Sequence, residues 1–199
     1  MRASRFVLPV VGLFLFVFQV GPVQGALVKL DLAEYFLAPG DSLTVQVIYE
    51  VTEPSINAAN AGFRLESAPI GSAAGTLTTS LAAVTKSTMD PYIFNPNAGF
   101  FATGSGGIVA TGGDNTDDGL EDLLVTGEYY LASITWTASA DADGDFSLDF
   151  TSLGVITVLT DTNDNDFLSA YNGAVVHVPE PASLLWLAIG SALGLRRRG

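Results

Sequence analysis

The chain has 199 residues, with 8 lysines and arginines against 21 aspartates and glutamates, a formal net charge of −13 at pH 7, and no cysteine. The negative charge argues against a nucleic-acid partner, because a phosphate backbone repels such a surface. The lack of cysteine excludes disulfides, thiol nucleophiles and cysteine-based zinc sites. Stability must therefore come from a hydrophobic core or from bound ions.

The N-terminal residues have the pattern of a secretory signal peptide. Arg2 and Arg5 precede the apolar run 6–20, and small or tolerated residues lead to a cleavage point before Ala26. We predict that residues 1–25 are a signal helix removed on export. An uncleaved N-terminal anchor is the alternative, because Gly21 and Pro22 break the helix without ensuring cleavage.

The remaining domain, residues 26–177, is long enough to bury one substantial core. It keeps three basic residues, Lys29, Arg64 and Lys86, against 20 acidic ones, a formal net charge of −17. A surface of this charge favours divalent cations and neutral or cationic partners.

Apolar and polar residues alternate along much of this domain, which is the pattern of half-buried strands. The clearest runs are 43–51, 130–138 and 146–150, and the second places Tyr130, Ala132, Ile134, Trp136 and Ala138 on one face. Shorter candidate strands are 28–32, 61–65, 77–81, 108–110, 156–159 and 174–178. We therefore predict an all-β, jelly-roll-like sandwich of about nine strands, flanked by the N-terminal signal helix and a C-terminal hydrophobic helix.

Aromatic residues divide into a predicted core set and a second set in a wetter stretch. Phe63, Trp136, Phe146 and Phe150 lie on the apolar faces and should dominate the core. Residues 87–119 are rich in glycine and predict an extended loop or bulged edge. Its aromatic residues either cover the core or form an exposed binding strip; they are Tyr92, Phe94, Phe100 and Phe101.

Clusters of aspartate suggest calcium, although neither of the two regular clusters is an EF-hand. The run from Asp141 to Asp145 alternates like the start of such a loop, but Phe146 and Ser152 stand where glycine and glutamate are needed. A solvated turn is the alternative for each cluster, because aspartate and asparagine favour turns. The candidate ligands are Asp114, Asp117, Asp118, Asp141, Asp143 and Asp145. No cofactor is required by the sequence.

Several segments in order resemble the cohesin-type β-sandwich. They are Pro39-Gly40-Asp41 before a strand, Asn60-Ala61-Gly62-Phe63-Arg64-Leu65, Leu131-Ala132-Ser133-Ile134-Thr135-Trp136, and Gly144-Asp145-Phe146-Ser147-Leu148. The resemblance implies a nine-stranded jelly-roll module for adhesion or docking, related in architecture to carbohydrate-binding modules, and it implies no catalysis.

The C-terminal residues form a tripartite tail. The motif Val178-Pro179-Glu180-Pro181 precedes the apolar run 182–195, and Arg196, Arg197 and Arg198 follow. The apolar run would span about 21 Å as a helix, short of the about 30 Å hydrocarbon core. The tail resembles the PEP-CTERM sorting signal of Gram-negative bacteria, which implies an exosortase-type processing enzyme as partner. It also implies residence in the inner membrane during sorting, with the arginines cytoplasmic, and then in the periplasm or at the cell surface.

Catalytic patterns are weak, and we predict that the chain is not an enzyme. His177 is the only histidine and adjoins the tail motif, which disfavours a Ser-His-acid triad. We expect a non-catalytic, membrane-sorted envelope or extracellular-matrix protein that mediates adhesion or docking with envelope proteins through flat, non-aromatic sheet faces. The alternative is a carbohydrate-binding module for exopolysaccharide. It requires a row of exposed aromatic residues drawn from Tyr92, Phe94, Phe100, Tyr129 and Tyr171.

Overall fold

A computed structural model describes residues 25–94, 99–116, 118–151 and 157–180. This part of the chain contains fourteen strands and one short 3-10 turn, η1 (Leu81–Ala83), so the all-β prediction is confirmed. The predicted signal helix and the apolar run 182–195 lie outside the described residues. Within the described ranges, no helix has the length and apolarity needed to cross a membrane.

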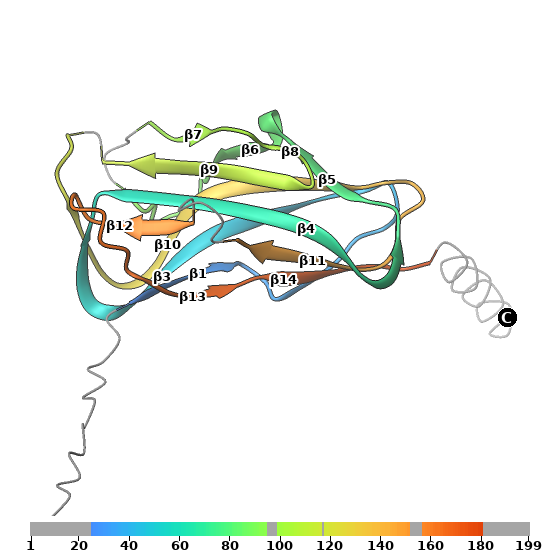
Figure 1. Cartoon of the computed structure of the whole chain (residues 1–199), viewed down its shortest axis with the longest axis horizontal. Helices are drawn as coiled ribbons and strands as arrows, with labels where there is room; N and C mark the ends of the chain where they lie inside the picture. Colours follow the sequence, from blue (N-terminus) through green and yellow to red (C-terminus); the bar gives the residue numbers. More distant parts are fainter. Residues whose placement is uncertain (1–24, 95–98, 117, 152–156, 181–199) are drawn as a thin grey trace, which may run out of the picture.

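Two layers of strands make up the fold (Figure 1). Sheet A has the order β13-β1-β3-β10, with two short strands beside the C-terminal half of β10. Its members are β1 (Ala26–Leu30), β3 (Ser42–Ala58), β5 (Leu77–Ser80), β6 (Val84–Lys86), β10 (Asp122–Ala138) and β13 (Leu168–Asn172).

Sheet B has the order β9-β4-β11-β14-β2, which can be followed from top to bottom in Figure 1 as far as β14. Its main strands are β2 (Glu34–Phe36), β4 (Asn60–Ala74), β9 (Val109–Asn115), β11 (Asp143–Phe150) and β14 (Ala174–Val178). Three short strands complete it: β7 (Phe101–Ala102), β8 (Gly106–Gly107) and β12 (Val158–Thr160). Because β5 pairs with both β10 and β8, it joins the two sheets along one side.

The pairing of β3 with β10 runs the whole length of the sandwich. It extends from Asp122 opposite Ala58 to Thr137 opposite Ser42, and two bulges interrupt it. The second bulge, between Tyr130 and Ala132, shifts the alternation by one residue, because a bulge places two residues of one strand opposite one of the other. Tyr130 therefore lies opposite Ile48 on the outer face, and the prediction that it faces the core was wrong.

The core forms between the sheets, as the alternating pattern predicts. Phe63, Trp136 and Phe146 are fully buried, whereas Phe150 is half-buried and packs at the margin. Buried Tyr49 crosses the core from β3 and donates hydrogen bonds to the carbonyl oxygens of Gly62 and Val158 on the other sheet. Burial raises the pKa of its phenol well above the usual value. This hydroxyl therefore stays neutral and links the two sheets.

Residues 87–119 contain more regular structure than we predicted. They include β7, β8 and β9, and β9 pairs with β4 over seven successive residues. Glycine makes this close pairing feasible: a Cβ atom on Gly113 would lie 2.8 Å from the carbonyl oxygen of Ala61 and 2.9 Å from the ring of Phe101. Since glycines contribute no apolar side chain, β9 lacks the alternation by which strands are recognised.

The turn between β4 and β5 provides a test of the fold. Gly75 has φ +76°, and a Cβ there would lie 2.6 Å from Cα of Ala142; Gly71 has φ +63° and open space around it. We expect Gly75→Ala to lower the free energy of unfolding by about 2–4 kcal/mol, from backbone strain plus overpacking. Gly71→Ala should cost only about 1 kcal/mol, from backbone strain alone. Urea unfolding followed by circular dichroism measures both, and equal losses would contradict the predicted clash.

Candidate functional site

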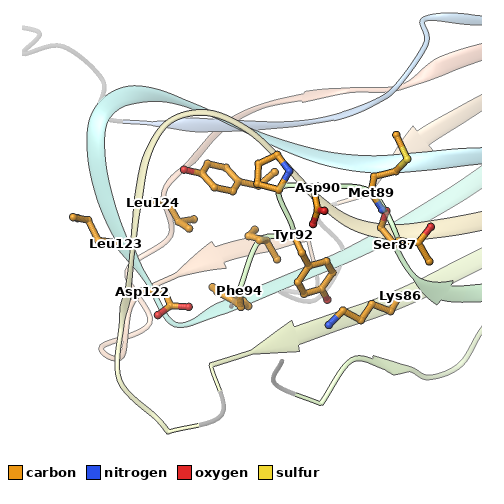
Figure 2. Close-up of a pocket in the computed structure, with 13 residues that line it drawn as sticks. Lys86, Ser87, Met89, Asp90, Tyr92, Phe94, Asp122, Leu123 and Leu124 are labelled. Carbon is orange, nitrogen blue, oxygen red and sulfur yellow. The ribbon is translucent and has the colours of Figure 1, made fainter. Parts of the chain in front are cut away.

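A groove lies at one end of the sandwich, between residues 86–94 and the N-terminal half of β10. Its cavity volume is about 790 Å³. Lys86, Met89, Asp90 and Tyr92 line one wall, and Asp122 and Leu123 line the other. Figure 2 shows these side chains around the hollow. The site combines apolar side chains with carboxylates and one lysine.

The first wall of the groove is fixed by contacts to both sheets. Backbone hydrogen bonds join Tyr130 of β10 to Pro91 and Ile93, at 2.9 and 3.0 Å. The Tyr92 hydroxyl donates a 2.5 Å hydrogen bond to the carboxylate of Asp114 on β9. Burial is the main cause that raises the pKa of Tyr92, and this hydrogen bond is the second. Residues 91–94 are therefore held between β10 and β9.

A buried carboxylate supports this wall. Asp114 is only 1% exposed, and it accepts hydrogen bonds from the Tyr92 hydroxyl and from the backbone N–H of Asn115. A buried charge without such partners would be costly. Lys86 places its ammonium 3.9 Å from the centre of the Tyr92 ring, which adds a cation–π contact at the rim.

The second wall is an open edge of β10. Among the described residues, Asp122 to Tyr129 pair with β3 on one side, and the next strand contact on the other side is the bridge of Tyr130 to Tyr92. The Tyr129 hydroxyl hydrogen-bonds to both the N–H and the carbonyl oxygen of Val125, at 3.0 Å each. A side chain therefore occupies the two backbone groups that a neighbouring strand would otherwise pair.

The outer face of sheet A carries short hydroxyl side chains. Cross-strand hydrogen bonds join Ser42 to Thr137 at 2.7 Å and Thr44 to Thr135 at 3.0 Å. Further along this face, Lys29 forms ion pairs with Glu50 and Glu128, and hydrogen bonds to these carboxylates raise its pKa. This part of the face is polar, and Lys29 and Glu128 line a shallow hollow in it.

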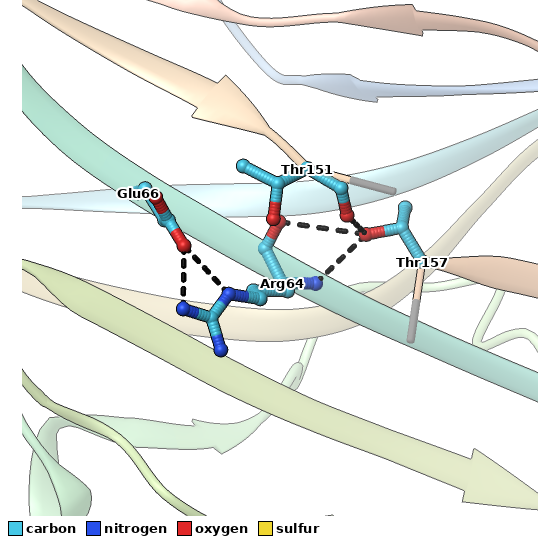
Figure 3. A network of polar contacts seen from close by, with 4 residues as sticks. All are labelled: Arg64, Glu66, Thr151 and Thr157. Carbon is cyan, nitrogen blue, oxygen red and sulfur yellow. Dashed lines mark hydrogen bonds and ion pairs between the residues drawn. The ribbon is translucent and has the colours of Figure 1, made fainter. Parts of the chain in front are cut away.

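On sheet B, an arginine–glutamate ion pair and two threonines make up a polar network (Figure 3). Arg64 donates to the carboxylate of Glu66, its neighbour on the same face of β4, with 2.6 Å contacts from two nitrogens. Thr157 accepts from the Arg64 backbone N–H at 3.0 Å and donates to the Thr151 carbonyl at 2.7 Å. This network fastens the chain on both sides of residues 152–156.

The tail motif begins in the fold. Val178 is the buried last residue of β14, and Pro179 and Glu180 are exposed, while Pro181 and Arg196 to Arg198 lie outside the described residues. Beside it, His177 bonds Asp145 at 2.8 Å and stacks on Phe36, which is 79% exposed. The histidine thus sits between a carboxylate and a phenyl ring, an arrangement without a nucleophile.

The structure does not bring the candidate calcium ligands together. In the ranges that it describes, no three acidic or histidine side chains are grouped to hold an ion, and Asp117 falls outside those ranges. Asp118 accepts a hydrogen bond from the backbone N–H of Leu120, and Asp143 accepts one from the backbone N–H of Ala74. Asp145 is hydrogen-bonded to the His177 ring. Asp141 is exposed, and a hydrogen bond from Ser139 lowers its pKa. Calcium therefore stays a prediction from the sequence.

Tyr92, Phe94 and Tyr129 line the groove, but the aromatic candidates do not form the row of exposed rings that a sugar platform requires. Phe94 is buried, Tyr92 and Phe100 pack against the core, and Tyr129 is bonded to its own strand. Tyr171 is exposed at the edge of sheet A, on β13. Sequence reasoning missed the exposed ring of Phe36, because a three-residue strand carries too little periodicity to show which side faces solvent.

The contribution of the Tyr92–Asp114 hydrogen bond to stability can be tested by mutation. We expect Tyr92→Phe to destabilise the protein by about 1–3 kcal/mol, because it leaves a buried carboxylate without its phenol donor. Tyr171→Phe removes a hydroxyl from an exposed ring and should change stability by less than about 0.5 kcal/mol. Chemical denaturation of both variants measures the difference, and a Tyr92→Phe variant as stable as the Tyr171→Phe control would contradict the role given to Asp114.

No protein-family model matches the chain, and no curated protein matches it. Solved structures do resemble it in fold. A chain of the CaDoc0917–CaCohA2 complex is 16% identical with a TM-score of 0.57, over 77% of this chain and 99% of that one. A type III cohesin module from the cell-surface anchoring scaffoldin ScaE of Ruminococcus flavefaciens is 11% identical with a TM-score of 0.55, over 80% and 89%. A chain of a type I cohesin–dockerin complex from Clostridium thermocellum is 14% identical with a TM-score of 0.51, over 77% of this chain and 99% of that one. The described domain is thus a cohesin-like β-sandwich.

Proposed function

We propose that this chain is an exported, membrane-sorted, non-catalytic protein of the envelope or extracellular matrix, whose sandwich docks on partner proteins. The observation that carries the proposal is the cohesin-like sandwich itself, at a TM-score of 0.57 to a chain of a two-protein complex. Fold alone does not fix function, so the surfaces of this chain must support the proposal independently.

The outer face of sheet A supports a protein partner over a sugar. Its paired hydroxyl groups at Thr44 and Thr135 offer hydrogen bonds on a non-aromatic surface, which suits a protein partner. A polysaccharide platform requires adjacent exposed rings. The exposed rings of Phe36, Phe101 and Tyr171 come from β2, β7 and β13, which lie at separate edges of the two sheets.

Export and sorting rest on the terminal sequences together with the course of the chain. The described chain enters the sandwich at Gly25 and leaves it at Glu180, at opposite ends in Figure 1. A signal peptide before β1 and an anchor after β14 would thus neither cross nor cover the domain. A tail embedded in the inner membrane would present the far end of the sandwich to the exterior.

The sorting part of the proposal is tested by intact mass. In fractionated native cells, we expect the mature protein to lack residues 1–25 and the segment after the Val178-Pro179-Glu180-Pro181 motif. Deleting the exosortase-type enzyme should restore the full tail and retain the protein in the membrane. A full-length tail in unmodified cells would contradict processing and leave a membrane-tethered periplasmic domain.

The docking part is tested by photo-crosslinking in native cells. A photoreactive amino acid at Thr135, Ile70 or Leu123 samples the face of sheet A, sheet B and the end groove in turn. Each position is exposed or half-buried, so the replacement should not disturb the core. We expect a discrete protein adduct at one of these surfaces and none from the others. Loss of every adduct, together with retention of the protein on exopolysaccharide in affinity gels, would favour the carbohydrate-binding alternative instead.

A further inference from the structure

We propose that the end groove docks an extended, lysine- or arginine-bearing segment of a partner protein, which adds as a strand to the open edge of β10. The inference rests on the docking function proposed above and names the surface and the chemistry of its partner. Three properties of the groove carry it: a strand edge that no other described strand pairs, exposed apolar side chains, and carboxylates.

The edge of β10 opposite β3 offers backbone groups with which an arriving segment can pair. An exposed strand edge is a template for another strand, and proteins cover such edges unless they use them. Among the described residues, Asp122 to Tyr129 have a strand only on the β3 side, and the Tyr129 hydroxyl satisfies the N–H and the carbonyl of Val125 at 3.0 Å each. A side-chain hydroxyl can rotate away, so an arriving strand can replace it with two backbone hydrogen bonds.

The apolar side chains provide burial. Leu123 on β10 is 64% exposed and Met89 on the opposite wall is 47% exposed, and both line the groove. Large apolar side chains gathered at a hollow mark an interaction surface. An extended segment lying between the walls would cover both of them.

Charge selects the partner. Asp90 and Asp122 lie on opposite walls of the groove, and residues 26–177 carry a formal net charge of −17. Such a field attracts cationic segments and repels a second copy of the same domain. A segment with lysine or arginine is therefore favoured over pairing of β10 with β10 of another copy.

The position of the groove suits a partner outside the membrane. Asp122 begins the 17-residue strand β10, and the turn after its last residue leads to Gly144, which pairs with Val178, the first residue of the tail motif. The groove and Val178, where the tail motif begins, are therefore at opposite ends of the sandwich.

The probe is a fluorescent eight-residue peptide that alternates valine and lysine, added to the full-length protein in a mild nonionic detergent. We expect saturable binding by fluorescence anisotropy that weakens as salt rises. A twin peptide with N-methyl groups on alternate residues keeps the charge but cannot pair along one edge, and it should bind at least about 10-fold more weakly. A glutamate-for-lysine peptide should not bind.

Variants assign the binding to the groove. Leu123→Lys removes apolar area and adds a repelling charge, so it should weaken the peptide about 10-fold, whereas Leu81→Lys, at an exposed leucine on η1 away from the groove, is the matched control. Tyr129→Phe frees the backbone groups of Val125 and should tighten binding about 3-fold, an effect that a purely structural role would not produce.

Four results would overturn the inference. Equal binding of the N-methylated peptide would reduce the effect to non-specific charge attraction, and equal losses in the two lysine variants would move it off the groove. A cellular crosslink at Thr135 with none at Leu123 would leave the docking function standing and place it elsewhere. A self-associating protein whose dimer is lost in Leu123→Lys would assign the edge to a second copy.

Discussion

The pairing of β3 with β10 is the constraint on which the other features depend. These two strands of 17 residues form the centre of sheet A, with β1 and β13 added on one side and β5 and β6 on the other. The bulges lie between Val125 and Gly127 and between Tyr130 and Ala132, and β5 and β6 pair only with residues from Ala132 onward. Within the described residues, the edge of β10 from Asp122 to Tyr129 has no strand beside it opposite β3, and it borders the groove. The same register that closes the core thus leaves one end of the sheet open.

The domain holds its sheets together without disulfides. Tyr49 crosses the core from sheet A to carbonyl groups of sheet B, and Tyr92 reaches from the groove wall to Asp114. Tyr49 is fully buried and Tyr92 is half-buried, and each uses the hydroxyl at the end of its ring, so apolar burial and a polar contact come from one side chain. A chain without cysteine can therefore link its two sheets through packing and tyrosine hydroxyls instead of disulfides.

Much of the fold could be predicted from alternation, because strands with one buried face carry a period of two. The runs at 43–51 and 146–150 and the core positions of Phe63 and Trp136 follow from it. The bulge beside Tyr130 could not be predicted, since one extra residue leaves no mark in the composition. Strand β9 was hidden by its glycines, and β13 by its parallel pairing with β1, which depends on residues far away in sequence.

The groove was beyond sequence reasoning for a similar reason. Its two walls come from segments that are some thirty residues apart, and nothing in the pattern of either shows that they face each other. The aspartates differ from the groove in one respect: their density in the sequence suggested a shared ion, whereas in the structure Asp118 and Asp143 accept backbone hydrogen bonds and Asp145 bonds His177. Turn chemistry and metal ligation use the same residues, and only their arrangement in space separates them.

The placement of the groove and Val178 at opposite ends of the sandwich has a mechanical consequence. If the tail is anchored and the groove holds a partner, tension enters at Val178 and at β10 and runs along the strands. Force in this direction loads the hydrogen bonds between neighbouring strands in shear, so many must break together instead of one after another. A 17-residue strand at about 3.3 Å per residue also gives the domain a length of roughly 55 Å. The sandwich would then be a stiff, force-bearing spacer between the membrane and whatever it holds.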